Sequence, residues 1–127
     1  MITRRLVLLC LLAVPGWAVG QSSAELNQLG VEAYEAKRFE EAVDHFERAY
    51  ALNPGVDAIV KNLTNACMVA AQERAEQGDY DGALRLLERA IEVSPDNFAP
   101  LVQMGAYYLR MNQVQDAIFR LEEAIKL

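Results

Sequence analysis

The eighteen residues GDYDGALRLLERAIEVSP, Gly78 to Pro95, repeat the pattern of KRFEEAVDHFERAYALNP, Lys37 to Pro54. The two copies are related by a shift of 41 residues. The matched pairs are Phe39 and Tyr80, Ala42 and Ala83, Phe46 and Leu87, Ala49 and Ala90, and Pro54 and Pro95. A third copy, NQVQDAIFRLEEAIKL, begins at Asn112 and follows with a shift of 34 residues. The same shifts align Leu29-Gly30 with Ala70-Ala71 and Met104-Gly105, so a whole unit is repeated.

Each unit is predicted to form two helices. Ser22 and Glu25 have the spacing of a capping box, and Leu26, Leu29 and Ala33 follow at helical spacing. Polar or glycine-containing breaks separate the two helices at Lys37-Arg38, Gly78-Asp79 and Asn112-Gln113. The second helix carries its own apolar stripe, and Pro54 and Pro95 end it in the first two units. The small residues at Gly30, Ala42 and Ala49 predict close approach between helices.

These repeated positions resemble those of the tetratricopeptide repeat family, whose unit of about 34 residues is a helix-turn-helix. The resemblance spans residues 23–127, with repeats at about 23–54, 56–95 and 98–127. It implies an all-α solenoid of about three antiparallel helix pairs. The chain departs from the family pattern where an early tryptophan is usual, since Leu26, Cys67 and Leu101 occupy that position.

Seven extra residues precede the second unit, because the first shift is 41 residues and the second is 34. Val56, Ile59, Val60, Leu63 and Cys67 keep helical spacing through this segment, and no breaker follows Gly55. We therefore expect two added turns on the first helix of the second unit. The alternative is a longer loop, which the apolar stripe disfavours.

Residues 1–20 have the three parts of a secretory signal peptide. Arg4 and Arg5 precede an apolar stretch from Leu6 to Val14, and the small residues Ala18 and Gly20 suit a cleavage site. The apolar stretch is shorter than the roughly 20 residues of a bilayer-spanning helix, so an uncleaved anchor is the second choice. We expect cleavage after Gly20 and a periplasmic or secreted protein.

The charge balance excludes several classes of partner. The chain has 18 acidic and 12 basic residues, and removal of Arg4 and Arg5 leaves 10 basic residues and a net charge of −8. Because no basic stripe is present, the sequence argues against a nucleic-acid partner and against binding to an anionic membrane surface. We also expect no membrane insertion after signal cleavage. Cleavage also leaves Cys67 as the single cysteine, so no intrachain disulfide can form.

The sequence offers little for catalysis. His45 is the only histidine, and the spacings His-x-x-x-His and Cys-x-x-Cys do not occur. We expect His45 to be an ordinary packed or solvated helix residue and Cys67 to be a small core residue. No cofactor, no metal and no enzymatic activity are therefore expected.

Recognition by the family takes place on an extended surface that the first helices line. Asn27, Val31 and Tyr34 have the spacing i, i+4, i+7, which places them on one helix face. The repeat register aligns them with one trio in each of the other two units. The matched trios are Met68, Gln72 and Ala75, and Val102, Ala106 and Leu109. The predicted partner-binding residues are Asn27, Val31, Tyr34, Met68, Gln72, Val102, Gln103, Ala106 and Arg110. The alternative is that part of this row belongs to the core.

Family members that grip the acidic tail of cytosolic chaperones use a clamp of Lys, Asn, Asn, Lys and Arg. The matching positions in this chain are Asn27, Val31, Val69, Ala99 and Gln103. The clamp is therefore absent, and the sequence argues against an acidic tail as the ligand.

The sequence thus predicts an interaction adaptor or scaffold of the cell envelope that binds a partner protein or a peptide. Two alternatives remain: the repeat segment of a longer exported enzyme such as a peptidase, or a self-assembling structural repeat protein. The apolar residues of the last helix bear on the self-assembling alternative. This helix carries Val114, Ala117, Ile118, Leu121, Ala124 and Ile125, more apolar residues than one preceding helix can cover. We expect part of this stripe to be exposed, and self-association through the C-terminal repeat would cover it.

Overall fold

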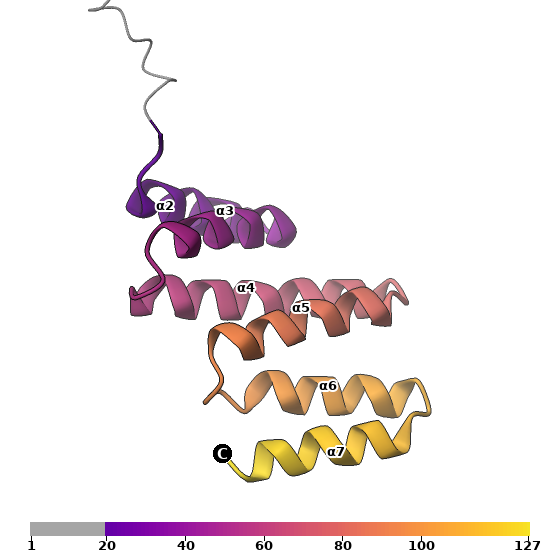
Figure 1. Ribbon diagram of the computed structural model, residues 1–127. Coiled ribbons are helices and arrows are strands. Elements are labelled where there is room, and N and C mark those ends of the chain that lie inside the picture. Colours follow the sequence, from indigo (N-terminus) through magenta and orange to yellow (C-terminus); the bar gives the residue numbers. More distant parts are fainter. Residues whose placement is uncertain (1–19) are drawn as a thin grey trace, which may run out of the picture.

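The computed structural model describes residues 20–127, which form three antiparallel helix pairs (Figure 1). The first helices of the pairs are α2 (Ser23–Glu35), α4 (Asp57–Glu76) and α6 (Ala99–Arg110). The second helices are α3 (Phe39–Leu52), α5 (Tyr80–Val93) and α7 (Val114–Ile125). No strand occurs in this range, so the predicted all-α fold of three helix pairs is confirmed. The expected signal peptide lies outside the described residues except for Gly20, and it stays a prediction.

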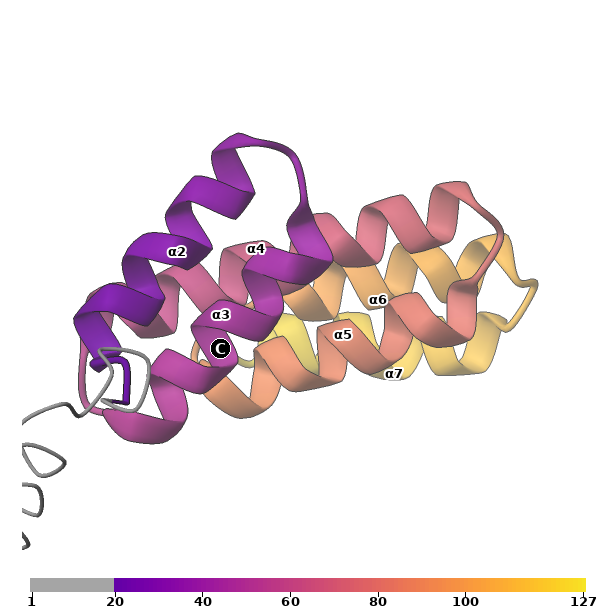
Figure 2. The same cartoon turned by 90° about the horizontal axis from the view of Figure 1, so that it is seen from above.

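The pairs stack in the order of the sequence. Within each pair the two helices pack together, and contacts between pairs run mainly from α3 to α4 and from α5 to α6, with a few between successive first helices. Figure 1 shows the three layers, with α2 and α3 at one end of the stack and α7 at the other. Seen from above, α2 crosses α4 at an angle, so the first two pairs are turned relative to each other (Figure 2).

The helix ends follow from local hydrogen bonds. The predicted capping box at the start of α2 is confirmed: the Glu25 backbone N–H donates to the Ser22 hydroxyl at 3.2 Å, and the Ser22 N–H donates to the Glu25 carboxylate at 2.8 Å. Each first helix ends in a turn with one left-handed residue, namely Lys37, Gly78 or Asn112. These three residues occupy the breaks that the sequence indicated.

Small residues allow the helices within a pair to approach closely. Ala42, Ala49, Ala83 and Ala90 are completely buried. A Cβ atom added at Gly30 would overlap the ring of Phe46 on the facing helix. In the third pair, a Cβ at Gly105 would lie 2.7 Å from Cγ of Leu121. Close packing inside each pair therefore depends on the small positions that recur along the sequence.

The seven additional residues lengthen α4. This helix has 20 residues, against 13 in α2 and 12 in α6. Ile59 and Leu63 of its first half, and Cys67 just after it, are buried against the first pair and α5. The prediction of added helical turns is confirmed, and the longer loop is excluded.

Candidate peptide-binding groove

Two hollows lie between successive first helices. One, of about 300 Å³, is bordered by α2 and α4, and the other, of about 320 Å³, is bordered by α4 and α6. The first is lined by Val31, Tyr34, Glu35, Phe46, Asn62 and Asn65. The second is lined by Met68, Val69, Gln72, Glu76, Gln103, Tyr107 and Arg110. Because both hollows border α4, we describe them together as the first-helix groove.

Most of the partner-binding residues predicted from the sequence border this groove. Val31 and Tyr34 line the first hollow, and the second is lined by Met68, Gln72, Gln103 and Arg110. Asn27, Val102 and Ala106 line neither hollow: Asn27 is half-buried beside the first, and the other two are exposed on α6. The partner-binding role of these nine residues stays a prediction.

Part of the predicted row of partner-binding positions belongs to the core. Ala75, the last member of the second trio, is buried in a cluster with Ala83 and Leu87 of α5. Val31, Tyr34 and Met68 are half-buried and pack against core clusters with one side. The groove therefore has a packed apolar floor, while its exposed groups are mainly polar.

Side-chain amides connect the walls of the groove. Gln103 of α6 donates through Nε2 to the backbone carbonyl of Met68 on α4 at 2.9 Å and to the Tyr107 hydroxyl at 2.8 Å. Between α2 and α4, Asn62 Nδ2 donates to Asn27 Oδ1 at 2.9 Å. These bonds hold Gln103 and Asn62 in fixed positions. The carbonyl oxygen of each amide retains acceptor capacity that a bound peptide N–H could use.

The charges that line the groove are few and mixed. The Arg110 guanidinium lies over the ring of Tyr107, with Cζ 5.9 Å from the ring centroid. Glu76 accepts a hydrogen bond from Gln72 Nε2 at 3.0 Å, and Glu35 borders the first hollow. The lining thus holds two carboxylates and one guanidinium, so it does not offer the basic environment that an acidic peptide requires.

The sequence did not identify every residue of the groove. Asn62 and Asn65 line the first hollow but were not among the predicted binding residues. Asn62 lies before the part of α4 that matches α2, and Asn65 matches Ala24 at the shift of 41 residues. Tyr107 was also not among the predicted residues; its ring is buried, while its hydroxyl accepts from Gln103 at the second hollow.

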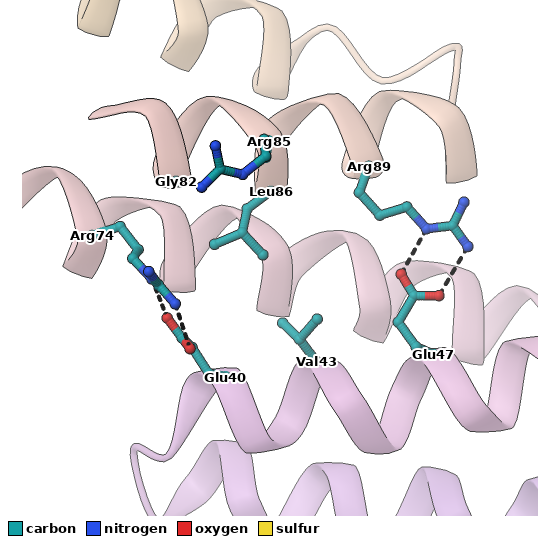
Figure 3. Close-up of a pocket in the computed structure, with 8 residues that line it drawn as sticks. All are labelled: Glu40, Val43, Glu47, Arg74, Gly82, Arg85, Leu86 and Arg89. Carbon is teal, nitrogen blue, oxygen red and sulfur yellow. Dashed lines mark hydrogen bonds and ion pairs between the residues drawn. The ribbon is translucent and has the colours of Figure 1, made fainter. Parts of the chain in front are cut away.

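A third hollow, of about 310 Å³, lies on the side of the second helices (Figure 3). Val43 and Leu86 form its floor, and ion pairs stand at its two ends. Arg89 contacts Glu47 through Nε at 2.6 Å and Nη2 at 2.9 Å. At the other end, Arg74 binds the Glu40 carboxylate through Nε and Nη2. Both pairs join the first repeat to the second, so these arginines stabilise the stack.

Cys67 and His45 are the two residues that the sequence analysis considered for catalysis. Cys67 is fully buried, and this burial raises the pKa of its thiol to about 12. His45 is half-buried, and its Nε2 lies 3.7 Å from the Glu41 carboxylate. Within residues 20–127, no group of three His, Cys, Asp or Glu side chains could hold a metal ion.

None of the helices in residues 20–127 combines the length and apolar character needed to cross a bilayer.

Two family models of the tetratricopeptide repeat match the chain, one at residues 23–56 and the other at residues 74–127. Among solved structures, MamA is similar over 83% of this chain and 57% of that chain, with 21% identity and a TM-score of 0.57. The second TPR of Spaghetti (RPAP3), bound to HSP90 peptide SRMEEVD, is similar over 84% of this chain and 93% of that chain, with 15% identity and a TM-score of 0.52. At these identities the two structures support the fold.

Curated relatives are much longer than this chain. The Hsp70-Hsp90 organizing protein of Triticum aestivum is 31% identical over 103 residues, which cover 81% of this chain and 16% of that protein. The CTR9 homolog of Arabidopsis thaliana is 27% identical over 112 residues, covering 86% of this chain and 9% of that protein. The chain thus spans less than a fifth of either relative. The repeated helix pairs, the matches to both models and the similar solved structures agree: the chain belongs to the tetratricopeptide repeat family.

Proposed function

We propose that this protein is an interaction adaptor of the cell envelope that binds a partner protein, or an extended peptide from one, in the first-helix groove. The Hsp70-Hsp90 organizing protein and the peptide-bound RPAP3 repeats support an adaptor role by family resemblance. The observation that carries the proposal is the pair of neighbouring hollows along α4, each with an apolar floor and fixed side-chain amides. The proposal assigns binding, and no reaction, to residues 20–127.

The chemistry of the groove favours an extended peptide with apolar side chains. The two hollows can each accept an apolar group, because Tyr34 and Phe46 border one and Met68 and Val69 border the other. Amides beside them can bond the peptide backbone, whose N–H and C=O groups otherwise lose water without compensation. Recognition would then be distributed along successive helices instead of being concentrated in one pocket.

The acidic peptide of the RPAP3 structure does not transfer to this chain. Its 15% identity supports the fold, and the positions that match the family's clamp include Val31, Val69 and Ala99, none of which carries a charge. Asn27 and Gln103 already bond to neighbouring helices. A carboxylate in this groove would also lie near Glu35 and Glu76, and repulsion between these like charges would disfavour its binding.

The envelope location rests on residues 1–20. Two arginines, an apolar stretch and small residues before Gln21 together support cleavage and export. Intact-mass measurement of the purified protein, together with cell fractionation, tests this part. A mature chain beginning at Gln21 in the envelope fraction is expected, whereas a stable cytosolic product that retains Met1 would contradict it.

Affinity capture with a matched pair of variants tests binding in the groove. Ala106 is exposed on α6 and is one of the predicted partner-binding residues, and Ala51 is exposed on α3, outside both hollows. Each is changed to arginine, and the proteins captured from envelope extract are quantified against the wild type. Ala106→Arg should lose the specific partner and Ala51→Arg should retain it. Equal capture by both variants would contradict a groove-mediated interaction.

A further inference from the structure

The outer face of α7 is apolar and uncovered. Val114, Ile118, Phe119 and Ile125 expose 47%, 44%, 58% and 84% of their surface. Ala117 is the one buried residue of this helix. The predicted exposed stripe is thus confirmed at Val114, Ile118 and Ile125.

Equivalent positions in the first two pairs are covered by the next first helix. The position of Ile118 corresponds to Val43, which is half-buried, and to Leu84, which is 8% exposed. Ile125 corresponds to Tyr50 and Ile91, both half-buried. In those pairs α3 packs on α4 and α5 packs on α6. The outer face of α7 therefore has the composition of an interface between helices.

Phe119 shows that a continuing stack would not cover the whole face. Its equivalents are Asp44 and Arg85, which remain exposed although another pair follows each of them. A further pair seated on α7 in the same way would leave the Phe119 ring in water, with only the Arg120 guanidinium 5.6 Å from its centroid. An occupant that also covers Phe119 must therefore contact a wider part of the α7 surface than a further helix pair would.

The opposite end of the stack does not complement this face. Glu25 and Glu32 are exposed on α2, at the positions where α6 carries the buried residues Pro100 and Tyr107. Stacking of one copy's α7 on another's α2 would bring an apolar face against these two carboxylates, which is unfavourable because buried charges lose hydration. Head-to-tail assembly is therefore disfavoured.

We infer that the α7 face binds the α7 face of a second copy, in a closed two-fold dimer. A two-fold interface uses the same patch on both chains, so the patch must complement itself. The apolar residues of one copy can pack against those of the other. Glu122 and Lys126 supply one exposed carboxylate and one exposed ammonium group on the same side of the helix, so the charges can also pair between copies. This dimer would leave the first-helix groove of each copy open, and the inference does not depend on the groove having a ligand.

Sedimentation equilibrium of protein purified after expression of the full chain tests the dimer. We expect a reversible monomer–dimer equilibrium. Ile118→Glu and Ile125→Glu should each weaken it about tenfold or more, because each places a charge in the interface. Leu52→Glu is the matched control, since Leu52 is 60% exposed on α3 and lies outside the α7 face. Circular dichroism confirms that each variant is folded.

A monomer at every concentration up to the millimolar range would overturn the inference. So would equal effects of Ile118→Glu and Leu52→Glu, or growth into species without a defined size.

Charge exchange tests the two-fold pairing directly. Glu122→Lys gives each face two lysines, and Lys126→Glu gives each face two glutamates. Each variant alone should dimerise more weakly than the wild type, and an equimolar mixture should form a heterodimer at wild-type strength or tighter. A mixture that behaves as the sum of its separate components would contradict pairing of α7 with α7.

Discussion

The three turns that join the helices of each pair carry different residues at their left-handed position, and this difference predicts a stabilising substitution. Lys37, Gly78 and Asn112 occupy the same left-handed position, with φ of 59°, 82° and 59°. In the first turn, the Lys37 N–H donates to the Tyr34 carbonyl and the Arg38 N–H donates to the Ala33 carbonyl, both at 2.9 Å. The same pair of bonds recurs in the other two turns, as in a Schellman motif.

Lysine is the least suitable of the three residues for this conformation. A left-handed residue with a Cβ costs about 1–2 kcal/mol, whereas glycine adopts it freely but loses more chain entropy on folding. Lys37 is exposed, so its removal sacrifices no buried contact. We expect Lys37→Gly to raise the free energy of unfolding by about 0.5–1 kcal/mol.

The reverse change is predicted at the second turn. A Cβ at Gly78 would meet no atom within 4 Å, so the effect of Gly78→Ala is confined to the backbone. It should lower the free energy of unfolding by about 1 kcal/mol. Lys37→Ala, which keeps a Cβ, is the control and should leave stability close to that of the wild type.

Urea titration followed by circular dichroism measures these changes. The transition midpoint should move while its slope stays constant, which indicates a change in stability without a change in the surface exposed on unfolding. The reasoning would be refuted if Lys37→Gly destabilised the protein as glycine does inside a helix, or if Gly78→Ala had no effect.

Packing and titration give further expectations, and those on stability are measured by urea titration. Ala83 is completely buried, so Ala83→Leu should lower the free energy of unfolding by about 1–3 kcal/mol, whereas Glu76→Ala on the surface should change it by about 0.5 kcal/mol at most. Gly30→Ala should cost about 1–3 kcal/mol, because the new methyl group meets the buried ring of Phe46; a wild-type midpoint would show that the ring can move aside. Burial raises the pKa of the Cys67 thiol to about 12, so the thiol should not react with a thiol reagent at pH 8 until the protein unfolds. An unfolded thiol titrates near 8.5, so stability relative to Cys67→Ala should be constant below about pH 8 and fall as pH rises toward 12; a flat difference would contradict this burial.

Local chemistry explains how much of the fold could be predicted from the sequence. Ser22 and Glu25 define the start of α2 through bonds three residues apart, and the recurring small residues mark close contacts in every unit. Cys67 was assigned to the core because its position continues an apolar helical stripe. These features depend on spacing within one helix or on comparison between repeats, and both are visible in the sequence.

Features that depend on distant partners were not predictable in the same way. The ion pair of Arg89 with Glu47 joins residues 42 positions apart, and neither residue type specifies the other. The left-handed conformation of Lys37 contradicts the preference of lysine, and only its alignment with Gly78 hints at it. The groove was predicted only in part, because helical spacing identifies a face but does not tell whether a neighbouring helix covers it.

The central claim is that the first-helix groove is the surface that meets the partner in the cell. Site-specific photo-crosslinking tests it most directly, with a photoreactive amino acid placed at Gln72 in the groove or at Arg85 on α5, both exposed. After irradiation of living cells, the account predicts a crosslinked partner from position 72 and none from position 85. A partner captured from position 85 but not from position 72 would contradict it.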